Sequence, residues 1–200
     1  MSMANLITLA RLPLLLLLVG FMFVPSFEVR LAGLALLVIL FLMDWFDGYV
    51  ARLRQEVTEI GAVLDIALDR SVENILWITF MYLGLVPLWV PIVFLIRSFV
   101  VDGIRGVALA RGKSGFGMMY SSLGRFLVAS RFMRALYGLA KAVIFGLLYL
   151  TWALALKNPN ILVTLHPLNQ GLIFFTTGLC IVRGLPVILD GRVLFERDNA

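Results

Sequence analysis

Four aspartates stand close together in an otherwise apolar part of the chain. Asp44 and Asp47 are three residues apart and follow the run LAGLALLVILFLM, whereas Asp65 and Asp69 are four residues apart and precede SVENILWITFMYLGLV. Spacings of three and four place side chains on one face of a helix. Two antiparallel helices joined by a short loop would therefore bring the two pairs into one acidic cluster.

A cluster of four carboxylates needs a counter-charge, because like charges and burial both raise the pKa of a carboxyl group. Protons could keep some of the acids neutral, or hard cations could bind, since Mg²⁺, Mn²⁺ and Ca²⁺ prefer carboxylate oxygen. Two such ions about 4 Å apart form a clamp suited to phosphoryl transfer. Arg52 adds a planar donor suited to phosphate oxygens, and the small residues Gly48, Ala51 and Gly61 would let a ligand approach the helices closely.

The composition indicates that these acids belong to an integral membrane protein. The chain has 200 residues, of which 62% are hydrophobic and 14% are charged, whereas a soluble domain is about half apolar and about a quarter charged. Its apolar runs reach the length of about 20 residues that spans a bilayer. We therefore expect an all-α membrane protein in which residues 1–200 form a single domain.

The apolar runs predict six transmembrane helices separated by proline and glycine. Pro25, Pro87, Pro159 and Pro167 are expected to lie in connections, and His166 is expected in the short loop before Pro167. The predicted spans cover approximately residues 5–24, 31–54, 60–85, 89–111, 123–154 and 168–189.

The basic residues predict how these spans are oriented. Lysine and arginine outnumber aspartate and glutamate by 17 to 12; we attribute this excess to cytoplasmic loops, which collect Lys and Arg, and expect no nucleic-acid partner. Both termini, the 52–60 loop and the four aspartates should then face the cytoplasm. The residues that mark this side are Arg52, Arg54, Arg111, Lys113, Arg125, Arg192 and Arg197.

Other catalytic chemistries have little support in the sequence. The chain has one cysteine, Cys180, and one histidine, His166. A single cysteine excludes an internal disulfide and a metal–thiolate cluster. With one histidine beside a proline, a zinc site or a Ser-His-Asp triad is not expected.

The acidic pattern resembles the signature of a known enzyme family. The spacing Asp44-x2-Asp47-Gly48-x2-Ala51-Arg52-x8-Gly61-x3-Asp65-x3-Asp69 is similar to that of the CDP-alcohol phosphatidyltransferases, and the opening Asn5-x2-Thr8-x2-Arg11 resembles the N-L-L-T-x2-R of many members. The resemblance implies an enzyme that moves a phosphatidyl group from CDP-diacylglycerol, or a similar CDP-lipid, to the hydroxyl of an alcohol and releases CMP. It also implies a membrane-bound homodimer.

The resemblance further implies a role for each motif residue. Asp44, Asp47 and Asp65 would hold two Mg²⁺ or Mn²⁺ ions at the diphosphate. Asp69 would be the general base that deprotonates the attacking hydroxyl, with an overlapping role as a metal ligand. The CDP-lipid would contact Thr8, Asp44, Asp47, Gly48, Ala51, Arg52 and Gly61.

A second stretch resembles the phosphatidylglycerophosphate synthases of this family and bears on the acceptor. The segment from Arg97 to Arg105, RSFVVDGIR, is similar to their R-E-x-x-V-S-G-L-R, and Ser121-x2-Gly124-Arg125 is similar to their S-x2-G-K. These members use glycerol 3-phosphate, an anion that requires cations around it. The candidate acceptor-binding residues are Arg97, Arg105, Arg125, Arg131 and Arg134, with Lys141 on the same helix face as Arg134.

Departures from that pattern leave other acceptors open. Ser98 and Asp102 replace the glutamate and the serine of the related stretch, and the usual G-K-x-K-T-x2-Q does not continue after Gly124. Inositol phosphate is the main alternative acceptor, and serine is a further one. A cationic acceptor such as choline would not suit the arginines.

Two other classes of protein account for less of the sequence than the enzyme does. A cation- or proton-coupled transporter also places acids in its spans, but the acids here lie near one membrane face, and the halves of the chain show no inverted repeat. A membrane scaffold would explain the apolar composition and leave the eight-position motif unexplained.

Overall fold

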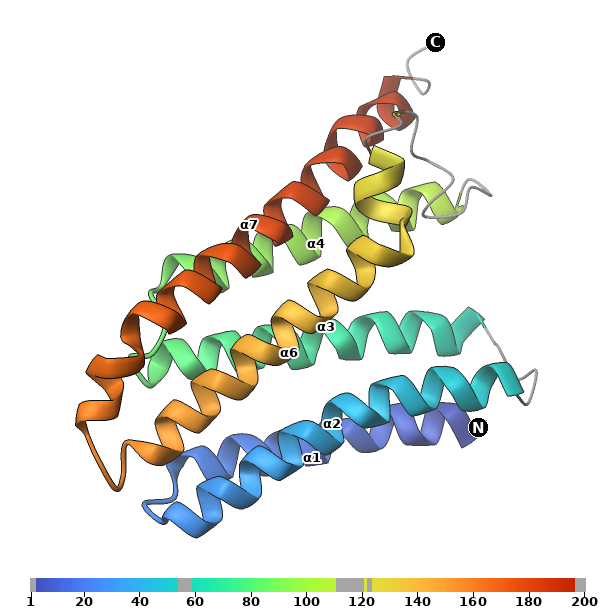
Figure 1. Ribbon diagram of the computed structural model, residues 1–200. Coiled ribbons are helices and arrows are strands. Elements are labelled where there is room, and N and C mark those ends of the chain that lie inside the picture. The colour runs from blue at the N-terminus through green and yellow to red at the C-terminus, as the bar shows by residue number, and fades with distance from the viewer. Residues whose placement is uncertain (1–2, 54–58, 111–120, 122–123, 197–200) are drawn as a thin grey trace. The chain divides into compact units, whose positions relative to one another are not determined.

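The computed structural model of the chain is all-α over the residues that it describes, which confirms the predicted fold class for them (Figure 1). The structure describes the backbone of residues 3–53, 59–110, 121 and 124–196. Within these ranges, the side chains that lie outside the described set belong to residues 3–7, 44–53, 59, 60, 62, 110 and 192–196.

Helices account for nearly all of the described backbone. The four N-terminal helices begin and end close to the spans predicted from the apolar runs. The helical segments are α1 Met3–Phe23, α2 Phe27–Leu53, α3 Glu59–Tyr82, α4 Trp89–Ala110, the short π-helix η1 Arg125–Ala129, α6 Arg131–Leu154 and α7 Asn160–Glu196.

Local signals set several helix ends. Ser26 begins α2, since its Oγ accepts a hydrogen bond from the N–H of Val29 at 3.4 Å and donates one to Glu28 at 2.9 Å. Hydrogen bonds from backbone and from this hydroxyl lower the pKa of the Glu28 carboxyl group. At the end of α3, Gly84 adopts φ +75°, the left-handed conformation that glycine supplies after a helix.

The predicted fifth span is divided in the structure. Ser130 is extended at φ −64°, ψ 142°, so η1 ends there and α6 begins at Arg131. The Ser130 hydroxyl accepts a hydrogen bond from the N–H of Met133 at 3.1 Å, which is the geometry of a helix N-cap. Serine, which favours this position, therefore starts a new helix inside the predicted span 123–154.

The predicted loop around His166 and Pro167 is wrong, because both residues lie within α7. The helix instead begins at Asn160, where Asn158 Oδ1 accepts a hydrogen bond from the N–H of Asn160 at 3.1 Å. Asn158 and Pro159 provide a capping residue followed by a proline, a combination that favours a helix start. Pro167 costs one backbone hydrogen bond but does not end the helix.

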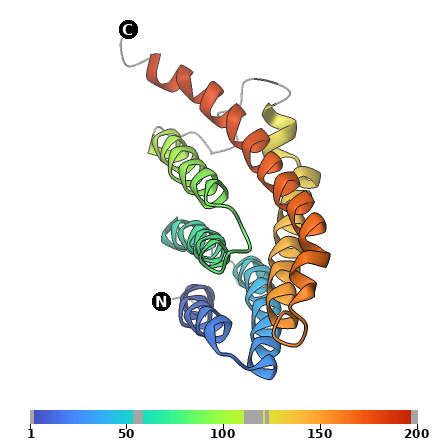
Figure 2. The same cartoon turned by 90° about the vertical axis from the view of Figure 1, so that its left-hand side faces the viewer.

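The chain forms two compact units, and each is considered by itself. The first contains residues 1–87 and 145–169, and the second contains residues 88–144 and 170–200. In the first unit, α1 packs against both α2 and α3. Figures 1 and 2 show these helices side by side, with α2 antiparallel to α1 and α3, so the start of α1, the end of α2 and the start of α3 share one end of the unit.

Helical periodicity defines the buried face of α1. Its buried residues recur at intervals of three and four, which is the spacing of one helix face. This face carries two polar residues at its N-terminal end and is apolar beyond them. The residues are Thr8, Arg11, Leu15, Leu18 and Met22.

The opposite end of the first unit is closed by Arg30 and Trp152. Arg30 donates hydrogen bonds to the carbonyl oxygens of Val24 at 3.1 Å and Trp152 at 3.0 Å, and its guanidinium lies 4.3 Å from the centroid of the Trp152 ring. Trp152 Nε1 donates to the carbonyl of Met22 at 2.8 Å. These contacts join α1, α2 and α6. The end of the unit that holds the start of α1, the end of α2 and the start of α3 is called the acidic end below, because the four aspartates belong to its helices.

In the second unit, a small apolar core joins α4, η1 and α7. It consists of Val101 and Ala108 of α4, Val128 of η1 and Val187 of α7. The core brings the short π-helix against two long helices.

Two helices in the part of the chain described with side chains are long and apolar enough to cross a membrane. By length and composition they are Arg131–Leu154, with mean hydropathy 1.5, and Asn160–Gly191, with mean hydropathy 2.0. A shorter apolar helix covers Thr8–Phe23.

Candidate functional site

Two of the four aspartates lie on α3 at the edge of its buried face. Leu68 and Val72 on this face are buried, whereas the side chains of Asp65 and Asp69 are 48% and 42% exposed. The two carboxylates are thus anchored on a packed helix and still accessible to a ligand.

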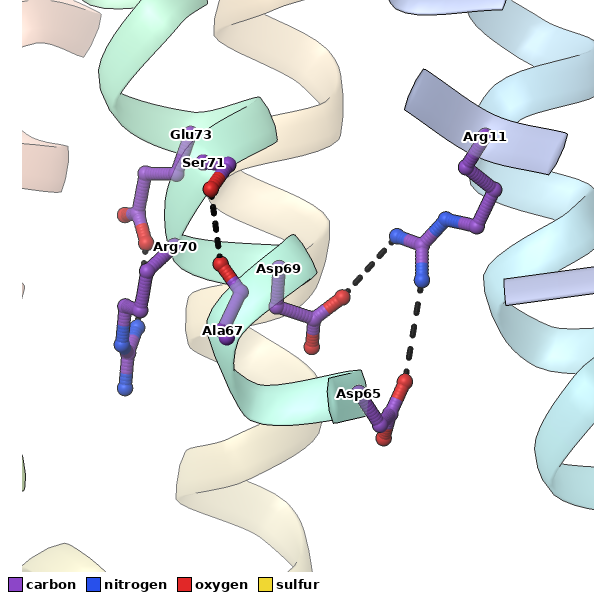
Figure 3. A network of polar contacts seen from close by, with 7 residues as sticks. All are labelled: Arg11, Asp65, Ala67, Asp69, Arg70, Ser71 and Glu73. Atoms are coloured by element: carbon purple, nitrogen blue, oxygen red, sulfur yellow. Dashed lines mark hydrogen bonds and ion pairs between the residues drawn. The ribbon is translucent and has the colours of Figure 1, made fainter. Parts of the chain in front are cut away.

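Arg11 of α1 joins these two carboxylates, as Figure 3 shows. Its Nη2 donates a hydrogen bond to Asp69 Oδ1 at 2.9 Å, and its Nη1 lies 3.7 Å from Asp65 Oδ1. The Arg11 side chain is only 2% exposed. A single buried guanidinium therefore faces both aspartates of α3.

Two predicted CDP-lipid contacts lie one helical turn from these groups. Thr8 is buried on α1 one turn before Arg11. Gly61 lies in the first turn of α3, one turn before Asp65, and is partly exposed. Both residues belong to the same end of the first unit as Arg11.

The other motif positions lie on α2. Asp44, Asp47, Gly48, Ala51 and Arg52 fall within the helix Phe27–Leu53, and their side chains lie outside the described residues. The buried positions earlier in α2 are 30, 33, 37 and 40. Positions 44, 47 and 51 continue this spacing of three and four along the same helix.

A second ion pair lies on the side of α3 away from Arg11 (Figure 3). Arg70 Nη1 lies 3.1 Å from Glu73 Oε2, and the Glu73 side chain is 3% exposed. Because a buried carboxylate requires a partner, this pair stabilises α3. Glu73 is thus a buried acid paired within α3, unlike the accessible Asp65 and Asp69.

In the second unit, three cations surround the ring of Tyr137. The ring centroid lies 5.8 Å from Arg97 Cζ, 4.7 Å from Lys141 Nζ and 5.0 Å from Arg183 Cζ. Cations on an aromatic face are attracted by the ring quadrupole. We call Arg97, Lys141 and Arg183 with Tyr137 the Tyr137 cluster.

Arg97 and Arg183 are the two buried cations of this cluster, and each is 8% exposed. Nε and Nη1 of Arg97 have no hydrogen-bond partner among the described residues. Arg183 Nε donates to the carbonyl of Leu127 in η1 at 3.2 Å. Short π-helices occur often at functional sites, and this one is tied to the cluster.

The other predicted acceptor residues differ in their surroundings. Arg105 Nη1 lies 3.7 Å from Asp102 Oδ1 on α4, so the Asp102 carboxylate partly neutralises the charge of Arg105. Arg125, Arg131 and Arg134 are exposed at the start of η1 and in α6. Of the predicted set, the structure therefore places Arg97 in the Tyr137 cluster.

The donors at the acidic end are chemically suited to a divalent cation. Asp65 and Asp69 offer accessible carboxylate oxygens, which hard cations such as Mg²⁺ and Mn²⁺ prefer. Among the residues described with side chains, no group of three or more potential ligands is found. A four-aspartate site therefore also requires Asp44 and Asp47, whose positions on α2 are given above.

The sequence patterns did not assign Arg11, Tyr137 or Arg183 to a site, whereas Lys141 was already noted beside Arg134. A signal existed for Arg11, because it is the only charged residue in the sequence of α1. Charged residues within apolar helices usually have a function or a partner. Tyr137 carried no such signal, since an aromatic residue in an apolar helix is unremarkable until the neighbouring helices are placed.

Comparison with known proteins identifies the family. Residues 1–182 match the family model for CDP-alcohol phosphatidyltransferase, and the chain belongs to this family.

Individual relatives have two kinds of name. The chain is 34% identical over 124 residues to a CDP-diacylglycerol–glycerol-3-phosphate 3-phosphatidyltransferase of Bacillus subtilis (strain 168), covering 56% of this chain and 64% of that protein. It is 29% identical over 104 residues to a protein of the same name from Rickettsia bellii (strain RML369-C), covering 52% and 58%. It is 35% identical over 88 residues to a candidate cardiolipin synthase of Mycobacterium tuberculosis (strain ATCC 25618 / H37Rv), covering 44% and 42%. Each match spans less than two thirds of the relative.

Proposed function

We propose that the chain transfers a phosphatidyl group from CDP-diacylglycerol, or a similar CDP-lipid, to the hydroxyl of an anionic alcohol and releases CMP. The observation that carries the proposal is the pair Asp65 and Asp69, held by one buried arginine at the end of the first unit where the family signature lies. The proposal extends the family membership to a reaction, and it assigns the accessible acids to that reaction.

Asp69 is proposed to be the general base. The acceptor hydroxyl gives its proton to the Asp69 carboxylate, and the hydroxyl oxygen forms a bond to the phosphorus that carries the diacylglycerol. The bond from this phosphorus to the bridging oxygen breaks, and CMP leaves with that oxygen. A positioned base contributes typically about 10²–10⁴-fold to such a rate, and Asp69 is accessible enough to meet a substrate.

Two divalent cations, Mg²⁺ or Mn²⁺, are proposed to be bound by Asp44, Asp47 and Asp65, with Asp69 as an overlapping ligand. When bound, such ions would offset the negative charge of the diphosphate and of the leaving group. The carboxylate chemistry of the donors supports this assignment. Arg52 would contact the phosphates, and Thr8, Gly48, Ala51 and Gly61 would accommodate the CDP moiety.

Glycerol 3-phosphate is the proposed acceptor. The Tyr137 cluster supports an anion, because three cations lie around one ring and two nitrogens of the buried Arg97 lack a hydrogen-bond partner among the described residues. The printed names of two relatives also contain glycerol 3-phosphate. Arg105, Arg125, Arg131 and Arg134 would provide further positive charge.

Inositol phosphate remains an acceptor alternative because it carries the same dianionic group, and serine remains a weaker one. The similarity to a candidate cardiolipin synthase adds phosphatidylglycerol, a phosphodiester with a single negative charge. Three cations favour a phosphate monoester over that monoanion.

We propose that residues 1–200 form one multi-pass membrane domain with six spans, both termini and the acidic end facing the cytoplasm. Large apolar side chains are exposed on α1, α2, α4, α6 and α7, as illustrated by Leu16, Val38, Phe99, Leu139 and Phe174, while several arginines are buried. Exposed apolar surface of this extent suits a lipid environment. A homodimer, which the family suggests, would be detected by light scattering in detergent.

The reaction can be tested with purified protein in detergent, CDP-diacylglycerol, Mn²⁺ or Mg²⁺ and a panel of acceptors, with CMP release measured. We expect release with glycerol 3-phosphate that stops when EDTA removes the metal. Asp69→Asn should lower turnover about 10²–10⁴-fold and largely retain CDP-lipid binding. Asp190→Asn on α7 is the matched carboxyl-to-amide control and should retain turnover.

Three results would contradict different parts of this proposal. No CMP release with any acceptor would contradict the reaction itself. Full turnover in Asp69→Asn would leave the reaction but remove the base assignment. Release only with phosphatidylglycerol or serine would replace the proposed acceptor.

A further inference from the structure

Arg11 is unusual in its own helix. It is the only charged residue in the α1 sequence MANLITLARLPLLLLLVGFMF, and it is among the largest fully buried side chains of the described residues. A buried charge is costly unless it is paired in good geometry. The pairing with the carboxylates of Asp65 and Asp69 therefore helps to fix the position of the guanidinium.

The geometry of the pairing uses two different nitrogens. Nη2 bonds to Asp69 Oδ1 at 2.9 Å, and Nη1 faces Asp65 Oδ1 at 3.7 Å. A planar guanidinium presents its donors in a fixed fork and can span two acceptors, whereas a lysine ammonium is a compact point charge. One residue of α1 thereby fixes two residues of α3 that are one helical turn apart.

This contact affects how the two carboxylates are oriented. Asp65 and Asp69 carry like charges on one helix face, and both are nearly half exposed, so repulsion and solvent would otherwise favour several rotamers. Among the described residues, Asp69 is held through Oδ1. The second oxygen, Oδ2, is then the one left to take a proton from an acceptor.

We propose that Arg11 is a positioning residue, which holds Asp65 and Asp69 in their working orientation before cation or substrate binds. The proposal rests on the function proposed above. Arg11 has two opposed effects on such a site: its geometry orders the ligands, while its positive charge repels a divalent cation. Loss of the positive charge should tighten divalent-cation binding. Loss of the ordering contact should slow turnover at the same time.

The experiment compares Arg11→Met and Arg11→Lys with the wild-type protein in detergent. Affinity for Mn²⁺ is measured by electron paramagnetic resonance without substrate, turnover by CMP release, and stability by the thermal midpoint. Lys157→Met is the matched control, because it removes one positive charge from an exposed residue of the same unit that lies over Phe27. This control should leave Mn²⁺ affinity and turnover unchanged.

We expect Arg11→Met to bind Mn²⁺ at least about threefold more tightly, since a nearby like charge is removed. Its turnover should fall on the order of 100-fold, the usual effect of misplacing a catalytic group by about 1 Å. Arg11→Lys restores the charge without the fork. It should return Mn²⁺ affinity to within about twofold of wild type and restore only part of the turnover.

Full turnover in Arg11→Lys would overturn the proposal, because the fork would then be unnecessary. Loss of Mn²⁺ affinity, turnover and thermal midpoint together in Arg11→Met would also overturn it, since Arg11 would only stabilise the fold. If Arg11→Met does not fold, Arg11→Lys alone still tests the proposal. Near wild-type Mn²⁺ affinity with reduced turnover would support it, and full turnover would contradict it. A wild-type protein that neither binds Mn²⁺ nor releases CMP would instead contradict the proposed function, and with it this proposal.

Discussion

Replacing Tyr137 tests whether its aromatic ring is needed to hold the three neighbouring cations in place for acceptor binding. The residue is buried on α6, and its ring lies within 6 Å of Arg97, Lys141 and Arg183. Tyr137→Phe keeps the ring, whereas Tyr137→Leu removes it and leaves the cations to repel one another. We expect the first change to be silent for acceptor binding and the second to weaken it.

The size of the effect follows from the three contacts. A cation on an aromatic face contributes about 0.5–1 kcal/mol at exposed sites and about 2 kcal/mol when it is desolvated. Lys141 and Arg183 lie nearer the ring than Arg97, so a total of about 2 kcal/mol is a conservative sum. At about 1.4 kcal/mol per factor of ten, Tyr137→Leu should raise the KM for glycerol 3-phosphate about 10- to 30-fold.

The assay is CMP release with the acceptor and the CDP-lipid varied separately. The KM for CDP-diacylglycerol should change less than about threefold, because the cluster belongs to the proposed acceptor site. Phe132→Leu on the same helix is the matched control, since it removes an exposed ring and should change neither KM. The thermal midpoint of each variant reports the cost of the cavity left by Tyr137→Leu.

An equal rise of both KM values in Tyr137→Leu would refute this reasoning, because it would show general damage to the fold. An unchanged acceptor KM in a folded Tyr137→Leu variant would refute it more directly. The acceptor would then bind without the Tyr137 cluster.

Two further predictions concern stability. Gly33→Ala should cost about 1–3 kcal/mol, because an added Cβ would overlap the buried Tyr149 Oη and lie 2.8 Å from Tyr149 Cζ; the double variant with Tyr149→Phe should recover part of this loss, as thermal midpoints would show. Ser130→Ala should cost about 1 kcal/mol by removing the cap on the N–H of Met133, and Ser130→Asp should retain stability where Ser130→Ala does not.

The helices were predictable where apolar length and breakers agree. The sequence predicts spans at 31–54 and 60–85, and the structure has α2 Phe27–Leu53 and α3 Glu59–Tyr82. Gly84 and the prolines near these ends act locally, so their effect is visible in the sequence. Such ends need no knowledge of the rest of the fold.

The prediction failed where tertiary structure outweighs a local breaker. Pro167 lies inside α7, because a long apolar helix that starts at a strong cap can lose one backbone hydrogen bond and continue. Ser130 had the opposite effect, since its hydroxyl caps a new helix within one predicted span. Neither outcome follows from the hydropathy of the surrounding residues.

The candidate site was predictable in its residue types and only partly in its contacts. Spacing along one helix placed Asp65 and Asp69 on a common face, and both reach Arg11. The identity of that partner depends on how α1 is rotated against α3, which no local pattern encodes. The roles of the four aspartates as ligands and base remain predictions.

Buried arginines within the described residues differ in what compensates their charge, and this difference bears on function. Arg30 is satisfied internally by two carbonyl oxygens and the ring of Trp152, so a ligand has little to offer it. Arg11 is paired with carboxylates that a cation would also attract. These two arginines are held by the protein itself.

Arg97 is compensated least among the buried arginines of the described residues. Its described contact is the Tyr137 ring at 5.8 Å, and two of its nitrogens have no hydrogen-bond partner there. A buried donor left unsatisfied costs about 1–3 kcal/mol, and more when charged, so the cost would be relieved by an anion that accepts its hydrogen bonds. Of the arginines assigned to the acceptor, Arg97 should therefore contribute most to the binding of a phosphate group, and the exposed Arg125 and Arg131 should contribute less.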